Sequence, residues 1–235
     1  METINYEKII VNDNTISSGS FGKIYKCEYM GNIYAYKEFE SSSFLCNRKR
    51  KLENISNIKE DFLITPYYWI KKDGEKLGYL TKLLNGKDII SIQFLGIDYK
   101  IDIINKIKNQ IQLMHKYELI HADISSSNII LENDIPYIID FDNSSYNKYY
   151  TNIYDSSDMA QEFIRKYGIC KELDIFMFNL LTFELINNCN YNLIRKNIIL
   201  KNFGNFDNID SKDICETFFL DDSLPNKKFL IDTIK

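Results

Sequence analysis

The chain has 235 residues, of which 45% are hydrophobic and 26% charged, and its formal net charge is -4. This length can bury a sizeable core, and the apolar fraction excludes an intrinsically disordered chain. The slight acidity argues against a general nucleic-acid coat. The apolar runs are too short to cross a bilayer and the opening residues lack a signal-peptide pattern. We therefore expect a cytoplasmic protein with no membrane or nucleic-acid partner.

Cysteine and histidine are too sparse for a disulfide framework or a zinc site. The five cysteines are scattered without a Cys-x-x-Cys pair, and the two histidines do not have metal-ligand spacing. We expect reduced structural thiols.

The first part of the chain has strand-like patterns. Aromatic and β-branched residues alternate with polar ones over residues 23–29 and 33–37, around the turn Met30-Gly31-Asn32, which predicts a hairpin. An amphipathic helix is expected over 47–58. Two more strands follow over 63–71 and 78–83, separated by a turn at 72–75.

Beyond Asn85-Gly86 the pattern becomes mainly helical. Isoleucines at three- and four-residue steps predict a helix from about residue 101 to 116, and an apolar run predicts a buried helix over 174–187. A short hairpin, 129–131 with 137–139, lies between them. The sequence therefore predicts an α+β fold with a small β-rich lobe, residues 1–84, and a larger helical lobe, residues 85–235, forming one domain.

Three segments carry residues suited to phosphate chemistry. Gly19 and Gly22 lie in a turn between strands, where backbone N–H groups can approach an anion because no Cβ intervenes. Lys37 follows on the next strand and would need a partner such as Glu53 to be held on a phosphate; Glu60 is the competing partner.

The third segment is the most informative. Asp123 and Asn128 precede a short hairpin and Asp140 follows it, so the hairpin brings the three side chains together. Asn and Asp supply hard oxygen ligands for Mg²⁺, while a separate carboxylate can orient a hydroxyl nucleophile. Any one of these residues could be an ordinary turn residue, but that explains all three poorly.

Taken together, these segments resemble a protein kinase domain of the eukaryotic type, in the same order and over nearly the whole chain. Ser17, Gly19 and Gly22 match the glycine-rich loop, and Lys37 and Glu53 match the strand lysine and its helix partner. Leu80–Leu83 is similar to the strand and hinge that contact adenine. His121-Ala122-Asp123, Asn128 and Asp140-Phe141-Asp142 match the catalytic loop and the metal-binding motif.

Weaker matches continue downstream. Met159-Ala160-Gln161-Glu162 resembles the end of an activation segment, and Asp174 resembles the residue that braces the catalytic loop from a buried helix. Lys228 matches a late basic position that would pair with Glu162.

The resemblance implies a two-lobed fold that uses ATP and Mg²⁺, with Mn²⁺ as a second metal. Asp123 would orient the acceptor hydroxyl, with Lys37 and Asn128 completing the catalytic set, and Asn128 and Asp140 would hold the metal. The implied nucleotide-binding residues are Ser17, Gly19, Gly22, Ile24, Ala35, Lys37, Glu53, Thr81, Lys82, Leu83 and Ile130.

Four positions depart from the family pattern. Ser17 replaces the first loop glycine. Ala122 replaces an arginine that reads a phosphorylated activation loop, so we expect activity without that contact. Ser125 stands where a lysine usually contacts the γ-phosphate. Asp142 replaces a glycine and would either add a metal ligand or repel nucleotide; both interpretations stay open.

The run Arg48-Lys49-Arg50-Lys51 on the first helix predicts a solvated face, with a docking site for an acidic partner as the alternative. The expected activity is γ-phosphate transfer to a protein hydroxyl, Ser/Thr rather than Tyr. The small residue Ala122 keeps a small-molecule kinase as one alternative. Ser125 and Asp142 keep a nucleotide-binding pseudokinase acting as an interaction module as another.

Overall fold

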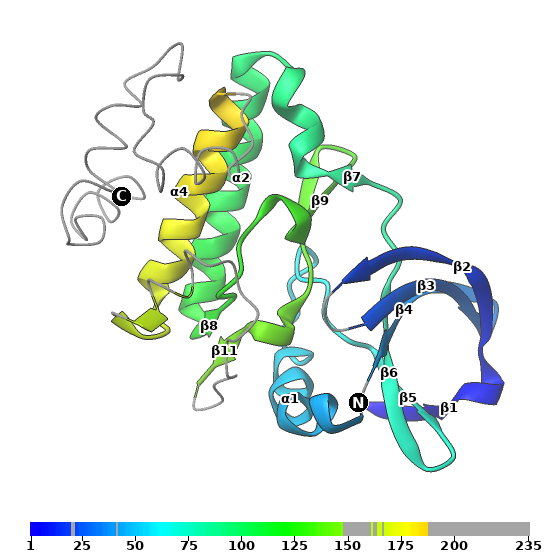
Figure 1. Cartoon of the computed structure of the whole chain (residues 1–235). Coiled ribbons are helices and arrows are strands. Elements are labelled where there is room, and N and C mark those ends of the chain that lie inside the picture. Colours follow the sequence, from blue (N-terminus) through cyan, green and yellow to red (C-terminus); the bar gives the residue numbers. More distant parts are fainter. Residues whose placement is uncertain (20–21, 41, 148–160, 162–163, 166, 188–235) are drawn as a thin grey trace, which may run out of the picture.

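The structure, a computed structural model, describes residues 1–19, 22–40, 42–147, 161, 164–165 and 167–187. It confirms the predicted α+β architecture: a β-sheet with one helix comes first along the chain, and a mainly helical part follows (Figure 1).

The first lobe contains a six-stranded sheet in the order β1-β5-β6-β4-β3-β2. All neighbouring strands are antiparallel except β1 and β5, which pair in parallel. The strands are β1 (Glu2–Asn5), β2 (Ile10–Gly19), β3 (Gly22–Tyr29), β4 (Asn32–Phe39), β5 (Tyr68–Lys72) and β6 (Glu75–Lys82). A short 3₁₀ turn, η1 (Tyr6–Lys8), joins β1 to β2.

The predicted turns form where the sequence places them. Met30 and Gly31 both have positive φ, at 49° and 76°, and so do Asp73 and Gly74, at 50° and 85°. Two consecutive positive φ values are the signature of the type I′ turn, whose twist matches that of antiparallel strands. These turns fix the registers of β3 with β4 and of β5 with β6.

The two faces of this sheet have different environments. One face buries a small cluster against which Tyr6 of η1 packs, and its members are Ile4, Ile9, Cys27, Tyr36, Ile70 and Leu80. Cross-strand partners in a sheet lie on the same face, and side chains alternate between faces. Lys37, one residue beyond Tyr36, therefore lies on the opposite face.

Helix α1 (Ser42–Ile55) begins earlier and ends earlier than the predicted helix over 47–58. The predicted strand over 63–71 was wrong for its first five residues, because β5 begins only at Tyr68. Leu63 instead forms a bridge to Ile138, and the N–H of Ile64 donates to the Ile138 carbonyl at 2.9 Å. Residues 63–64 thus pair with the second lobe, whereas the N–H of Tyr67 already donates to the Leu80 carbonyl of β6 at 2.7 Å.

The second lobe is built on two long helices, α2 (Ile97–Lys116) and α4 (Lys171–Asn187), which lie side by side (Figure 1). The predicted stripe is confirmed at Ile104, Ile107, Ile111 and Met114, which are buried, but its first residue, Ile101, is exposed and Ile103 is buried instead. The shorter elements are β7 (Lys87–Asp88), η2 (Ile89–Phe94), β8 (Leu119–Ile120), η3 (Ser126–Asn128), β9 (Ile129–Glu132), β10 (Ile135–Ile138), η4 (Phe141–Asn143) and β11 (Ser145–Tyr146).

The large core runs through both lobes. Leu52 and Ile55 of α1, together with Trp69 and Tyr79 of the sheet, belong to the same buried cluster as the faces of α2 and α4. The lobe boundary at residue 84 stays a prediction; it falls between β6, which ends at Lys82, and β7, which pairs with β9. Within the described ranges, each helix is too short or too polar to span a membrane.

Candidate active site

The register of the sheet collects the predicted nucleotide-binding residues on one face. Ile24 lies opposite Lys37, and Lys37 lies opposite Tyr79. Two residues along, Ala35 lies opposite Thr81. Because side chains alternate along a strand, Ile24, Ala35, Lys37 and Thr81 share this face. Their predicted contact with adenine stays a prediction.

The glycine turn follows β2 and precedes β3. Ser17 pairs with Ile24, and Gly19 pairs with Gly22 across the strands. A Cβ atom built on Gly22 would lie 1.9 Å from the Glu38 carbonyl oxygen of β4. Any side chain here would force β3 and β4 apart, so Gly22 has a structural requirement besides the predicted approach to phosphate.

Lys37 forms the electrostatic centre of the site. Its ammonium Nζ lies 2.8 Å from Asp140 Oδ2 and 2.7 Å from Asp142 Oδ2. Burial would lower the pKa of Lys37, but the two carboxylates outweigh it and hold the pKa above its ordinary value. Burial would likewise raise the pKa of Asp140, yet Lys37 holds it below its ordinary value. The pair therefore stays ionised at neutral pH.

Asp140 and Asp142 differ in their exposure. The Asp140 side chain is 34% exposed, whereas that of Asp142 is 1% exposed. Asp142 Oδ1 accepts a hydrogen bond from the Tyr79 hydroxyl at 3.1 Å. Burial raises the pKa of Asp142, with the Asp140 carboxylate adding to the rise and Lys37 opposing it.

The predicted catalytic loop, which begins with His121, Ala122 and Asp123, is held by the buried acid Asp174 of α4. Its two carboxylate oxygens accept from the backbone N–H groups of His121, at 2.9 Å, and Ala122, at 2.7 Å. His115 Nε2 of α2 lies 3.0 Å from the same carboxylate. The His121 ring also contacts the Ile139 carbonyl, at 2.8 Å. The predicted bracing role of Asp174 is therefore visible in the geometry.

Asp123 and Asn128 are directly joined. The Asn128 amide Nδ2 donates to the Asp123 carbonyl at 2.9 Å and to Asp123 Oδ2 at 3.0 Å. Burial raises the pKa of Asp123 to about 6, and Asp140 adds to the rise, while His121 and Asn128 oppose it. A carboxylate with this pKa is ionised near neutral pH and can accept a proton from a nearby hydroxyl.

The predicted pairing of Lys37 with Glu53 was wrong. The Glu53 carboxylate accepts from the Trp69 indole N–H at 2.9 Å and lies 3.9 Å from the Lys49 ammonium. It therefore faces β5 rather than the ammonium of Lys37, whose carboxylate partners are Asp140 and Asp142. The competitor Glu60 accepts from the Tyr117 hydroxyl at 2.6 Å.

The prediction of a solvated face on α1 was wrong for two of its four cations. Arg48 and Lys51 are buried, and both donate to the Asp142 carbonyl, from Nε at 2.9 Å and from Nζ at 2.7 Å. Lys51 also donates to the Ser144 carbonyl at 2.7 Å. Only Lys49 and Arg50, which are partly or fully exposed, fit the expectation.

A divalent metal fits the residues that the sequence assigned to it. Asn128 commits its amide nitrogen to Asp123, which leaves the amide oxygen as its ligand atom. Asp140 offers a carboxylate that is partly exposed. Mg²⁺ commonly takes one or two protein oxygens and fills its octahedron with phosphate and water oxygens.

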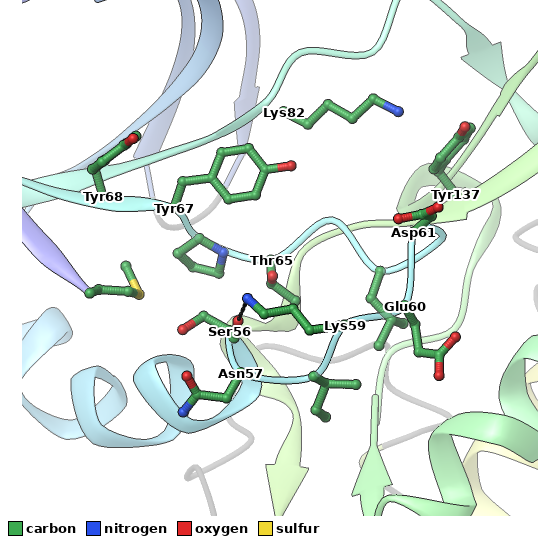
Figure 2. A pocket seen from close by; sticks show the side chains of 14 residues that line it. Ser56, Asn57, Lys59, Glu60, Asp61, Thr65, Tyr67, Tyr68, Lys82 and Tyr137 are labelled. Atoms are coloured by element: carbon green, nitrogen blue, oxygen red, sulfur yellow. Dashed lines mark hydrogen bonds between the residues drawn. The ribbon is translucent and has the colours of Figure 1, made fainter.

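A groove of about 750 Å³ lies between the end of α1, residues 56–68 and β10 (Figure 2). The Lys82 ammonium lies 4.3 Å from the centre of the Tyr137 ring at its margin. The lining includes neither Lys37 nor Asp123, Asn128 or Asp140. The side chain of Lys82 thus belongs to this groove, and only its backbone, with that of Leu83, is left for the predicted hinge role.

Several expectations lie outside the described residues. They are the matches at Met159, Ala160 and Glu162, and the late segment containing Lys228.

Cys27 and Cys170 are free thiols, as expected.

Comparison with known proteins defines the class. The family model of the protein kinase domain matches residues 10–218. The chain belongs to the protein kinase domain family.

Its relatives include two kinases of Dictyostelium discoideum, each a probable LIM domain-containing serine/threonine-protein kinase. They are 27% and 28% identical to this chain. The matched segments cover 77% and 78% of this chain but only 21% and 30% of the two kinases. A third relative, a probable bifunctional tRNA threonylcarbamoyladenosine biosynthesis protein of Methanobrevibacter smithii, is 28% identical over 55% of this chain and 24% of that protein. The chain thus spans less than a third of the length of these relatives.

Proposed function

We propose that this chain transfers the γ-phosphate of Mg-ATP to a hydroxyl group of a protein, with Ser/Thr preferred over Tyr. The observation that carries the proposal is the convergence of two linked pairs. Lys37 meets Asp140, and Asp123 meets Asn128, and Asp140 lies close enough to Asp123 to raise the pKa of its carboxyl group. The names of the two Dictyostelium relatives support the Ser/Thr preference.

The four side chains divide the work. Lys37 presents a buried ammonium that would neutralise phosphate oxygens. Asp123 would accept, or at least orient, the proton of the acceptor hydroxyl, and Asn128 fixes the direction of that carboxylate through its amide N–H. Because phosphoryl transfer needs mainly positioning and charge neutralisation, these roles account for the chemistry.

Asp140 and the amide oxygen of Asn128 would hold Mg²⁺, with Mn²⁺ as a substitute. When bound, the metal would supply positive charge that offsets the negative charge of the nucleotide phosphates. Asp140 is suited to this role because Lys37 keeps its carboxylate ionised.

The test compares two isosteric variants, Asp123→Asn and Asp140→Asn, with the wild type. We expect Asp123→Asn to lower phosphate transfer by about 10²- to 10⁴-fold and to change nucleotide affinity less than about twofold. Asp140→Asn should weaken binding of Mg-nucleotide because it removes a metal ligand charge. The measurements are transfer of labelled γ-phosphate and titration of a fluorescent ATP analogue.

The acceptor panel contains the protein itself, generic protein acceptors and a set of small molecules. Label on protein in the wild type, lost in Asp123→Asn, supports the proposal. Label on a small molecule alone would identify a metabolite or antibiotic kinase instead. Nucleotide binding without transfer to any acceptor would favour a pseudokinase. Equal loss of nucleotide affinity in both variants would contradict the separate roles of Asp123 and Asp140.

A further inference from the structure

We propose that Asp142 positions Lys37 for phosphate binding, in the place where a glutamate from helix α1 was expected. This inference rests on the proposed phosphotransferase function and concerns how the lysine is held. Asp142 directly follows the Asp-Phe pair of the metal-binding motif, where the sequence comparison expected a glycine.

One oxygen of Asp142 forms an ion pair and the other accepts a hydrogen bond. Oδ2 lies 2.7 Å from the Lys37 ammonium, and Oδ1 accepts from the Tyr79 hydroxyl at 3.1 Å. Tyr79 is the cross-strand neighbour of Lys37, so a single row of the sheet presents both groups to one carboxylate. A carboxylate that has an ammonium ion beside one oxygen and a hydroxyl donor on the other is held in one orientation.

These contacts separate the roles of the two acids. A metal ligand must offer an oxygen lone pair at an accessible edge, and the 1% exposed Asp142 side chain is enclosed by Tyr79 and Lys37. Asp140, at 34% exposure, is the acid that can reach a metal. When a metal engages Asp140, Asp142 would still hold Lys37 in place. The same pairing neutralises the Asp142 charge, which argues against repulsion of nucleotide.

Helix α1 fits this arrangement. Among its described side chains, Arg48 and Lys51 reach the loop and donate to the Asp142 carbonyl. Lys51 also binds the Ser144 carbonyl two residues further along. Arg48 places a permanent positive charge beside the loop that carries the Asp142 carboxylate. Its acidic residue, Glu53, is engaged by Trp69 on another face of the helix.

The experiment compares Asp142→Asn with Glu53→Gln, two isosteric removals of one carboxylate charge. Asp102→Asn serves as the matched control, because Asp102 is exposed on α2 and pairs with Lys106. Affinity for a fluorescent ATP analogue is measured without metal and with Mg²⁺, beside KM and kcat. We expect Asp142→Asn to weaken nucleotide affinity about tenfold under both conditions and to raise KM more than it lowers kcat. Glu53→Gln should change affinity less than about twofold.

Each other outcome overturns the inference. Tighter binding in Asp142→Asn would mean that Asp142 repels nucleotide. A loss confined to the Mg²⁺ condition would make it a metal ligand. A tenfold loss in Glu53→Gln with none in Asp142→Asn would restore the helix glutamate as the partner. If the wild type itself binds no nucleotide, the proposed function fails, and the role of Asp142 in nucleotide binding fails with it.

Asp142→Asn can also fail to fold, because it disturbs a buried charge pair. Tyr79→Phe is the second variant, since it removes only the hydrogen bond to Oδ1 and keeps the charge of Asp142. We expect a two- to threefold weaker nucleotide affinity in a protein with an otherwise intact thermal transition. The inference is overturned if folded Tyr79→Phe keeps the wild-type nucleotide affinity and Asp142→Asn either keeps it too or does not fold.

Discussion

The catalytic loop and helix α1 are both anchored through backbone groups, but with opposite charge. In the loop, the buried acid Asp174 accepts from two backbone N–H groups. At α1, the buried cations Arg48 and Lys51 donate to backbone carbonyls of residues 142 and 144. The first arrangement was expected from the family resemblance, and the second departs from it.

The difference shows how much freedom each anchor has. In the proposed function the loop must present Asp123 in one geometry, and a single carboxylate that accepts from two adjacent N–H groups fixes its backbone. Helix α1 is anchored by donors that bind backbone carbonyls, and a carbonyl accepts from a charged or a neutral donor. The sign of the charge on α1 can therefore change, provided that a carboxylate for Lys37 is supplied from elsewhere, as by Asp142.

The largest effect is expected for Asp174→Ala. The change removes the acceptor of two buried N–H groups and of the His115 contact, and unsatisfied buried donors cost about 1–3 kcal/mol each. We expect the free energy of unfolding to fall by about 3 kcal/mol or more, measured by urea denaturation, and phosphate transfer to fall at least about tenfold. Asp174→Asn keeps one acceptor oxygen and should lose less. Wild-type stability in Asp174→Ala would break the comparison.

A pH-dependent effect is expected for Lys51. Burial lowers its pKa to about 7, with Arg48 adding to the fall and Asp142 opposing it, against 10.5 in the unfolded chain. Between these values the unfolded state binds the proton and the folded state does not, so stability rises with pH. A neutral amine still has two N–H donors for the carbonyls of Asp142 and Ser144.

The variant Lys51→Met reports this contribution, because titrating groups that do not interact with Lys51 cancel in the difference from the wild type. The free energy of unfolding of the wild type minus that of Lys51→Met should increase between pH 7 and pH 10, by about 1 kcal/mol or more. Urea denaturation at pH 6.5, 8 and 9.5 measures it. A flat or falling difference would show that the ammonium stays charged, and would make the α1 anchor as strict as that of the loop.

The smallest effect is expected for a surface ion pair. Lys171 of α4 lies 2.7 Å from Glu118, but the two side chains are 38% and 62% exposed. Such pairs contribute about 0.2–1 kcal/mol, so Lys171→Met should change the free energy of unfolding by about 0.5 kcal/mol or less. A larger loss would show that burial is not what distinguishes the anchors of the active site.

Local pattern predicted most of the elements and the central residues of the site. The type I′ turns and the helical stripe on α2 depend on neighbours in sequence, and the order of Lys37, Asp123, Asn128 and Asp140 is a motif. The sequence also contains a pattern on α1 that the prediction of a solvated face did not take into account. Arg48, Lys51, Leu52 and Ile55 follow three- and four-residue steps, so the two cations lie on the buried stripe.

The remaining errors share a cause: the partners lie far away along the chain. The carbonyls that bind Arg48 and Lys51 are more than ninety residues further on, and no local rule indicates that a cation stripe will meet them. Leu63 likewise pairs with Ile138 rather than with β6. The role of Tyr79 depends on the register of β4 with β6, which alternation alone does not fix.

The short strand β1 has a practical consequence. Its four residues cover the outer edge of β5, from Glu2 opposite Tyr68 to Asn5 opposite Lys71. An uncovered edge strand is a template for pairing with another chain and a common origin of aggregation. For recombinant work, a truncation that begins at Tyr6 would remove this cover, so a purification tag is better joined ahead of Met1 by a flexible linker than used to replace the first five residues.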